Sequence, residues 1–315
     1  MQSLLLNFLK VTESAAIAAI PWVGSGDENA ADGAATNEMR KTLNKMKMNG
    51  TVVIGEGEID EAPMLYIGER LGIGGNHEVD IAVDPIEGTT PTVNGQGNAI
   101  TVIAAAKKGT LLHAPDMYMK KIAVGPKAKG KVHLDAPIEE NIRVVAEATG
   151  KKVQDIHILI QDRPRHKEYI NRIRQTGAKV HLFNEGDVIY SAATCIEGLG
   201  IDMFFGIGGA PEGVLGAVAV RCLGGEMQAK LLPRNDEERN RCREMGITDV
   251  DAVLTHEQLV ATDDCAFVAT GITDNLLVKG IETEDANYIT HSILINGLEK
   301  QLRYVKSTYP ILANV

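Results

Sequence analysis

The chain has 315 residues, of which 44% are hydrophobic and 23% are charged, and its formal net charge is −10. A chain of this length can bury a large core and is expected to form two lobes. The acidic balance argues against nucleic-acid binding, which normally needs a basic face. An anionic substrate could still bind where metal ions or a local basic cluster reverse the sign of the field.

Neither a membrane span nor a secretion signal is expected. No apolar run approaches the length of a membrane span, and the apolar segment at residues 4–9 lacks a basic region before it and a clear cleavage site after it. The four cysteines are well separated and form no CxxC pair, so neither a zinc site nor a redox motif is expected. Reduced thiols in this pattern fit a cytoplasmic protein.

Two helices are predicted at the start of the chain. Apolar residues between Leu5 and Ala19 recur at the helical period, and Pro21 ends that helix. In the second helix, Asp32 lies in the first turn, where the helix dipole favours an acidic side chain even without a functional role. The apolar face of the second helix comprises Ala31, Ala35, Met39, Leu43 and Met46.

Two predicted strands then end in acidic turns. Residues 51–54 lead into Gly55-Glu56-Gly57-Glu58-Ile59-Asp60-Glu61, and residues 79–83 lead into Asp84-Pro85-Ile86-Glu87-Gly88-Thr89. Pro85 is expected to end the strand pairing, and Thr89 is expected to cap a helix. Clustered carboxylates are ligands for hard divalent cations, and exposed acidic turns are the alternative interpretation.

The segment between the acidic turns and residue 121 contains further predicted elements. A short helix is predicted from Pro63 to Leu71, and a strand over residues 98–106 is given a hairpin partner at residues 111–114. Tyr118 follows, with two lysines at residues 120–121. The plain interpretation of this segment is a solvated basic strand edge.

From residue 138 onward, helices and strands alternate, which predicts a second α/β lobe. One strand ends at Arg163-Pro164-Arg165, in the densest basic cluster of the chain, and the helix that follows makes this turn a natural anion site. The next strand ends at Asn184-Glu185-Gly186-Asp187. The predicted helices cover residues 139–148, 168–175, 189–195, 214–223 and 236–245, and the predicted strands cover 156–160, 180–183, 201–205, 265–269 and 288–295.

A glycine-rich segment, Gly206-Ile-Gly-Gly-Ala-Pro-Glu-Gly213, follows the strand at residues 201–205. It partly matches a dinucleotide-binding fingerprint, but Pro211 occupies the third glycine position and no acidic ribose ligand follows a second strand. We therefore reject a nucleotide cofactor. The glycines suit close approach to a small charged ligand, and Glu212 is a third carboxylate at a strand end.

The acidic residues at these turns form one candidate set. A fold that brought them together would bind two or three Mg²⁺ or Mn²⁺ ions. Such paired metals serve phosphoryl transfer. The members of the set are Asp32, Glu56, Asp60, Asp84, Glu87 and Glu212.

Several long motifs are similar to those of a known family. The Asp84–Thr89 turn resembles the signature of the lithium-sensitive, metal-dependent sugar phosphatases and inositol monophosphatases. More closely, the chain resembles class II fructose-1,6-bisphosphatase, the bacterial GlpX type, over nearly its whole length. The motifs are Gly55-Glu-Gly-Glu-Ile-Asp-Glu-Ala-Pro-Met-Leu-Tyr66, Asp80-Ile-Ala-Val-Asp-Pro-Ile-Glu-Gly-Thr89, Ala114-Pro-Asp-Met-Tyr-Met119, Arg163-Pro-Arg-His166 and Gly206-Ile-Gly-Gly-Ala-Pro-Glu-Gly213.

The resemblance implies roles for individual residues. Asp32 and Glu56 match the ligands of one metal, and Asp84, Glu87 and Glu212 match those of another. Thr89 matches the hydroxyl that orients and activates the attacking water, with Asp60 as its acid/base partner. The matched substrate positions are Glu87, Gly88, Thr89, Tyr118, Arg163, Pro164, Arg165, Glu185, Gly186, Asp187 and Gly209. Of these, the two arginines would hold the phosphate that stays, and Glu185 and Asp187 the sugar hydroxyls.

The chain departs from the family pattern at three places. The superfamily usually has Asp where Glu87 stands, although class II members have Glu. Many class II relatives carry Lys where Glu28 stands, and a charge reversal beside a metal ligand would weaken phosphate or metal handling or alter the rate. The stretch after Leu232 is shorter than in many relatives, which trims a surface loop.

The resemblance implies an α/β fold, a layered α-β-α-β-α sandwich of the sugar-phosphatase type. Residues 1–137 are expected to form a metal-binding catalytic lobe and residues 138–315 a second α/β lobe with substrate turns and one metal ligand, the two sharing one active site. The implied reaction is hydrolysis of the 1-phosphate of fructose 1,6-bisphosphate by a cytoplasmic homo-oligomer, a dimer or tetramer, that uses two or more Mn²⁺ or Mg²⁺ ions per site.

Three alternatives remain open. The chain could act on sedoheptulose 1,7-bisphosphate, alone or as a dual bisphosphatase. It could act on an inositol phosphate, although the Arg163/Arg165 cluster favours a bisphosphate. It could also be a metal- or sugar-phosphate-binding regulator without catalysis, which Glu28 alone favours.

Overall fold

The structure is a computed structural model that describes residues 1–55 and 64–311. The chain forms two compact units: unit 1 comprises Met1–Gly109 and Asp264–Val315, and unit 2 comprises Thr110–Asp263. This division differs from the predicted boundary between residues 137 and 138. The reason is a long-range strand pairing, since residues 265–271 pair with residues 100–106 along their full length and return the end of the chain to unit 1.

Unit 1 is built on an eight-stranded mixed sheet with the order β11-β12-β10-β4-β3-β1-β2, and β13 pairs with β12. All neighbouring strands are antiparallel except the parallel pair β1 and β3. The strands are β1 (Asn49–Ile54), β2 (Arg70–Leu71), β3 (Glu78–Glu87), β4 (Ile100–Lys107), β10 (Cys265–Gly271), β11 (Glu282–Glu284), β12 (Asn287–Asn296) and β13 (Gln301–Pro310).

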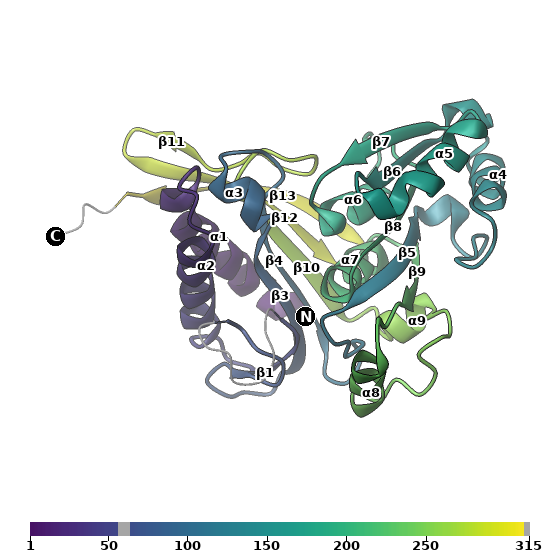
Figure 1. Ribbon diagram of the computed structural model, residues 1–315. Coiled ribbons are helices and arrows are strands. Elements are labelled where there is room, and N and C mark those ends of the chain that lie inside the picture. Colours follow the sequence, from purple (N-terminus) through teal and green to yellow (C-terminus); the bar gives the residue numbers. More distant parts are fainter. Residues whose placement is uncertain (56–63, 312–315) are drawn as a thin grey trace. The chain divides into compact units, whose positions relative to one another are not determined.

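Helices α1 and α2 pack together and cover one face of this sheet (Figure 1). Their buried side chains, including Phe8, Val11 and Met39, share a core with Ile81 and Leu294 of the strands. The helical elements of unit 1 are η1 (Gln2–Leu4), α1 (Leu5–Ala19), η2 (Ile20–Trp22), α2 (Glu28–Leu43) and α3 (Thr89–Val93). The two predicted N-terminal helices are therefore confirmed.

The segment Gln2–Trp22 is long and apolar enough to cross a membrane by length and composition, contrary to the expectation from the sequence. In unit 1, however, this segment is a core helix. Of its most apolar stretch, 56% is buried inside the protein. Core helices pass the same test because burial in a protein and burial in lipid both select apolar residues.

Two predicted local elements of the first half are wrong. The helix predicted from Pro63 to Leu71 does not form over the described residues 64–71, where the chain instead turns into β2, which pairs with β1. The hairpin partner predicted at residues 111–114 is no strand. Both neighbours of β4 are already present in β3 and β10, and Leu111 forms only an isolated bridge with Val260.

Unit 2 is a three-layer structure around a five-stranded mixed sheet with the order β7-β6-β8-β5-β9. Helices α4 and α5 pack on one face in an apolar core, and α6 and α7 contact the other face (Figure 1). The strands are β5 (Tyr118–Val124), β6 (His157–Gln161), β7 (Lys179–Phe183), β8 (Met203–Gly209) and β9 (Glu226–Leu231). The helical elements are η3 (Pro126–Ala128), α4 (Ile138–Thr149), η4 (Val153–Asp155), η5 (Pro164–His166), α5 (Lys167–Gln175), α6 (Asp187–Ala193), α7 (Ala210–Cys222), α8 (Asp236–Glu244) and α9 (His256–Leu259).

Local sequence explains where several of these helices begin and end. The Asp27 side chain caps α2 by accepting from Ala30 N at 3.0 Å, and Asn235 caps α8 by accepting from Glu238 N at 2.9 Å. Gly150 ends α4 in the left-handed conformation at φ 70°. The predicted α/β class is confirmed, because each unit has one mixed sheet with helices packed on it.

Candidate active site

The second acidic turn, Asp84–Thr89, lies in unit 1 at the end of β3. Asp84 and Glu87 are 9% and 5% exposed, and the Asp84 Oδ1 atom accepts a hydrogen bond from Ile86 N at 3.0 Å. Pro85 does not end the strand as predicted. β3 continues to Glu87 with a register irregularity between Asp84 and Glu87, which accommodates a residue that cannot donate to the ladder.

Gly88 and Thr89 connect β3 to α3. The N-cap of α3 is Gly88, in the left-handed conformation at φ 95°, and Thr89 is the first helical residue, so the predicted capping role of Thr89 is wrong. A Cβ atom on Gly88 would lie 2.6 Å from the Asn98 carbonyl oxygen, which leaves room only for glycine here.

The Thr89 hydroxyl donates to Asp32 Oδ1 at 2.9 Å, and its oxygen also lies 3.1 Å from the Ile86 carbonyl oxygen. Burial raises the pKa of Asp32, the Thr89 hydrogen bond lowers it, and the negative charge of Glu28 raises it. Glu28 Oε1 in turn accepts from the Thr90 hydroxyl at 2.9 Å. Two hydrogen bonds thus join the start of α2 to the start of α3.

The predicted site residues Glu56 and Asp60 lie outside the described residues. The structure therefore brings together Asp32 and Thr89, and it places Asp84, Glu87 and Gly88 on the strand and turn that lead to Thr89. This part of the site belongs entirely to unit 1.

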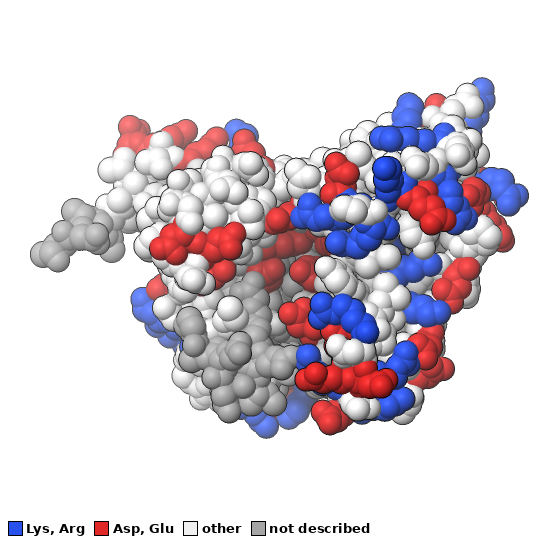
Figure 2. Space-filling view, viewed as in Figure 1, with Lys and Arg blue, Asp and Glu red and all other residues white. Residues whose placement is uncertain are grey.

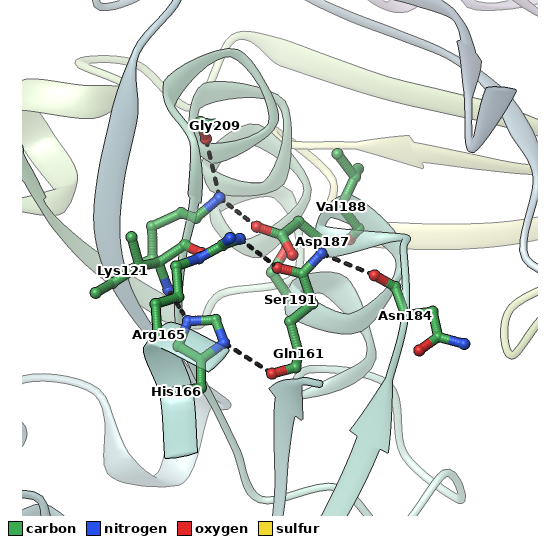
Figure 3. Close-up of polar contacts among 10 residues, drawn as sticks. Lys121, Gln161, Arg165, His166, Asn184, Asp187, Val188, Ser191 and Gly209 are labelled. Atoms are coloured by element: carbon green, nitrogen blue, oxygen red, sulfur yellow. Dashed lines mark hydrogen bonds and ion pairs between the residues drawn. The ribbon is translucent and has the colours of Figure 1, made fainter. Parts of the chain in front are cut away.

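The basic turn of unit 2, Arg163-Pro164-Arg165, is held in place by three contacts of Arg165. Arg165 donates through Nε to the Ile207 carbonyl oxygen at 2.8 Å and through Nη2 to Gln161 Oε1 at 2.6 Å (Figure 3). Its guanidinium carbon lies 5.0 Å from the centre of the Tyr118 ring, a cation–π distance. Two predicted substrate residues, Tyr118 and Arg165, are therefore in contact.

His166 stabilises the same turn through two hydrogen bonds. Its Nε2 atom accepts from Ile207 N at 2.7 Å, and its Nδ1 atom lies 2.7 Å from the Gln161 carbonyl oxygen, to which it donates (Figure 3). The side chain is fully buried, and burial lowers the pKa of His166. A neutral ring with its proton on Nδ1 satisfies both bonds.

A second turn of unit 2 lies beside the basic turn. Arg163 Nη2 is 3.7 Å from Glu185 Oε1, and Gln161 Nε2 donates to the Asn184 carbonyl oxygen at 2.8 Å. Gly186, at φ 114°, is the N-cap of α6. The predicted substrate residues Arg163 and Glu185 thus face each other. In Figure 2, Lys and Arg side chains gather over the part of unit 2 that carries β6 and α5.

Sequence reasoning missed the partner of Asp187. Lys121 Nζ lies 2.5 Å from Asp187 Oδ2 and 2.9 Å from the Gly209 carbonyl oxygen, and the lysine is 1% exposed (Figure 3). The interpretation of residues 120–121 as a solvated strand edge is wrong, because β5 has a neighbour on each side. The period of two along the strand was the available signal, since it places Lys121 on the same face as the buried Met119.

Glu212 lies in the first turn of α7, next to the Lys121 contacts. Burial raises its pKa, the positive charge of Lys121 lowers it, and the negative charge of Asp187 raises it. The predicted substrate position Gly209 is the N-cap of α7. A Cβ atom on Gly209 would lie 2.0 Å from Glu212 Oε2, so the glycine makes space for this carboxylate.

The acidic residues fit a hard divalent cation by their donor chemistry. Glu212 Oε2 is buried and has no hydrogen-bond partner among the described residues, an arrangement that costs free energy unless a positive charge is supplied. Within residues 1–55 and 64–311, however, no three His, Cys, Asp or Glu side chains form a group that could hold a metal by themselves. The predicted ligand Glu56 lies outside those ranges.

Comparisons with known proteins identify the family of this chain. A family model described as bacterial fructose-1,6-bisphosphatase, glpX-encoded, matches residues 2–309. A protein of Haemophilus influenzae named fructose-1,6-bisphosphatase class 2 is 47% identical over 98% of this chain and 96% of its own length. A protein of Escherichia coli K12 named fructose-1,6-bisphosphatase 1 class 2 is 45% identical over 98% of this chain and 95% of its own. The chain belongs to the glpX-encoded family of bacterial fructose-1,6-bisphosphatases.

Proposed function

We propose that this chain hydrolyses the 1-phosphate of fructose 1,6-bisphosphate and releases fructose 6-phosphate and inorganic phosphate. The observation that carries the proposal is the match along nearly the whole chain to relatives named fructose-1,6-bisphosphatase. The hydrogen bond between Thr89 and Asp32 supports it, because the two residues with matched roles in water activation and metal binding are in contact.

In this reaction Thr89 orients the attacking water. Its hydroxyl donates to Asp32, so the lone pairs of Oγ1 remain available to accept a hydrogen bond from water. Water held in this way can attack phosphorus in line with the leaving sugar oxygen. We assign to Asp60 the role of proton acceptor, which follows from the family resemblance.

Asp32 and Glu56 would hold one divalent cation, and Asp84, Glu87 and Glu212 another. When bound, such ions polarise the phosphoryl oxygens and lower the pKa of a nearby water. We propose Mn²⁺ or Mg²⁺, because both ions prefer carboxylate oxygens. The buried, unpartnered Oε2 of Glu212 supports its place in the set.

On the substrate side, Arg163 and Arg165 would bind the 6-phosphate. Two of the donors of Arg165 are already used within the protein, which fixes the direction of the remaining ones. Tyr118, Pro164, Glu185, Gly186, Asp187 and Gly209 complete the proposed sugar contacts, and Gly88 with Glu87 contacts the phosphate that leaves. The runner-up is sedoheptulose 1,7-bisphosphate, because the same two arginines favour any bisphosphate over an inositol monophosphate.

The test is phosphate release with Mn²⁺ and then Mg²⁺ from fructose 1,6-bisphosphate, sedoheptulose 1,7-bisphosphate and inositol 1-phosphate. We expect a preference for the fructose ester that a chelator abolishes. Asp84→Asn should remove the activity. Asp80→Asn is the matched control, since Asp80 is also buried on β3 and its Oδ2 accepts from Gly109 N at 2.7 Å. No release from any ester with either metal would refute the proposal, and unchanged release by Asp84→Asn would refute the site assignment.

We also propose that the enzyme is a cytoplasmic homo-oligomer without nucleic-acid or membrane partners. All four cysteines are free thiols, which supports a reducing compartment. The net charge of −10 supports the absence of a nucleic-acid partner. Light scattering of the eluted protein during size-exclusion chromatography would distinguish a monomer from a dimer or tetramer.

A further inference from the structure

The buried lysine of unit 2 has an environment built for a cation. Lys121 Nζ lies 2.5 Å from Asp187 Oδ2 and 2.9 Å from the Gly209 carbonyl oxygen. The positive charge of Lys121 also lowers the pKa of Glu212. Burying an ammonium group without a partner is unfavourable, and an apolar side chain would fill the same volume without that penalty. Met119, two residues earlier on the same face of β5, is such a side chain.

Neighbouring glycines leave the space that this arrangement needs. A Cβ atom on Gly208 would lie 2.1 Å from Asp187 Oδ2 and 3.1 Å from Lys121 Nζ. A Cβ atom on Gly213 would lie 3.2 Å from Lys121 Cδ. Side chains at either position would push the lysine or its partner aside. The ammonium group and the carboxylate therefore meet at a place that the backbone keeps open.

The contacts of Lys121 link two helix starts that carry proposed substrate residues. Asp187 is the first residue of α6, and Gly209 is the N-cap of α7. Lys121 reaches both from β5, which pairs with β8 directly before α7. In Figure 3 the ammonium group lies between the Asp187 carboxylate and the Gly209 carbonyl group. One side chain thus fixes two groups that come from different turns.

We propose that Lys121 is a positioning residue for the sugar: it holds the Asp187 carboxylate and the Gly209 peptide in the orientation in which they bind substrate. The inference rests on the proposed function, because it takes Asp187 and Gly209 as substrate contacts. One oxygen of Asp187 is held by Lys121, which leaves the other oxygen to accept from a sugar hydroxyl. In this proposal Lys121 acts on the substrate only through these two groups.

The neighbouring lysine provides a matched control. Lys120 lies on the opposite face of β5, where Nζ donates to the Leu134 carbonyl oxygen at 3.1 Å and lies within 6 Å of two aromatic rings. Lys120 is partly buried, and like Lys121 it donates to a backbone carbonyl oxygen. Its hydrogen bond and its ring contacts within the described part of the chain involve Leu134, Tyr169 and Phe205, which are not proposed substrate residues. Lys120→Met removes a lysine from the same strand, and we expect it to affect only the stability of the protein.

The experiment measures binding of fructose 6-phosphate by titration calorimetry, together with KM and kcat for fructose 1,6-bisphosphate, in wild type, Lys121→Met and Lys120→Met. We expect Lys121→Met to raise the Kd and the KM at least tenfold and to lower kcat less than threefold. Lys120→Met should lower the melting temperature but leave Kd and KM within twofold. A folded Lys121→Met protein with Kd and KM within twofold of wild type would overturn the inference.

A double-mutant cycle keeps the test valid if Lys121→Met fails to fold. The pair Lys121→Met/Asp187→Asn removes the buried charge that the single change leaves unpaired. If Lys121 acts through Asp187, the Kd of the double variant should differ less than twofold from the Kd of Asp187→Asn alone. A further tenfold loss would show independent action and overturn the inference. Wild type that neither binds fructose 6-phosphate nor hydrolyses the bisphosphate would instead refute the proposed function.

Discussion

One buried histidine of unit 2, His256, predicts a specific loss of stability in acid. Its Nδ1 atom accepts from Met227 N at 3.1 Å, and its Nε2 atom lies 2.9 Å from the Ala217 carbonyl oxygen, to which it donates. The ring is therefore neutral with its proton on Nε2. Burial lowers the pKa of His256 from 6.5 to about 4, because no solvent stabilises the charged form.

The sign of the effect follows from which state binds the proton. Above pH 6.5 the ring is neutral in both states and makes no difference to stability. As the pH falls below 6.5 the unfolded chain binds a proton that the folded protein refuses, so stability falls until the pH reaches about 4. The loss amounts to about 2 kcal/mol at pH 5 and approaches about 3 kcal/mol below pH 4.

The assay is urea unfolding at pH 7 and pH 5, with His256→Gln as the comparison. Gln can donate to Ala217 and accept from Met227, but it does not titrate. The substitution should cost stability at pH 7 through imperfect packing, and the gap between wild type and variant should shrink by about 2 kcal/mol at pH 5. An unchanged gap between pH 7 and pH 5 would refute the reasoning, since other titrating groups are common to both proteins.

Two further predictions concern the turn at the end of β3. Thr89→Val keeps the side-chain shape but removes the hydroxyl that donates to Asp32, and we expect phosphate release to fall about 10²- to 10⁴-fold. Thr89→Ser should stay within about tenfold of wild type, and equal rates for the two variants would contradict the role of the hydroxyl. Gly88→Ala should cost about 1–3 kcal/mol in urea unfolding, because φ is 95° and the new Cβ atom would meet the Asn98 carbonyl oxygen at 2.6 Å. Gly109→Ala, also in unit 1 at φ 77° but with nothing within 4 Å, should cost about 1 kcal/mol, and equal costs would exclude the close contact as the cause.

The elements of the fold that local sequence determines could be predicted. The helical period from Leu5 to Ala19 and the alternation of strands and helices after residue 138 reappear in α1 and in unit 2. The assignment of residues 264–315 to unit 1 could not be predicted, because it depends on β10 pairing with a strand more than 150 positions away. β9, β11 and β13 were missed for a related reason, since their partners decide whether such polar segments become strands.

Candidate site residues were predictable by type but not by contact. Carboxylates and glycines at the ends of buried strands are a local signal, and this signal made Asp84, Glu87 and Glu212 candidate ligands. The contact between Thr89 and Asp32 spans 57 positions, and the contact between Lys121 and Asp187 spans 66. No spacing rule specifies such pairs.

The buried lysine also explains why a pattern of charge was misleading. Two consecutive lysines on a strand must point to opposite faces, so a solvated interpretation can hold for both only if both faces are wet. In unit 2 neither face is, because α4 and α5 pack on one and α6 and α7 contact the other. The ammonium group of Lys120 is stabilised by aromatic rings and a carbonyl oxygen, and that of Lys121 is stabilised by Asp187. Each lysine on a strand between two helix layers therefore needs a partner for its charge. The partner of Lys121 is Asp187, a proposed substrate-binding residue.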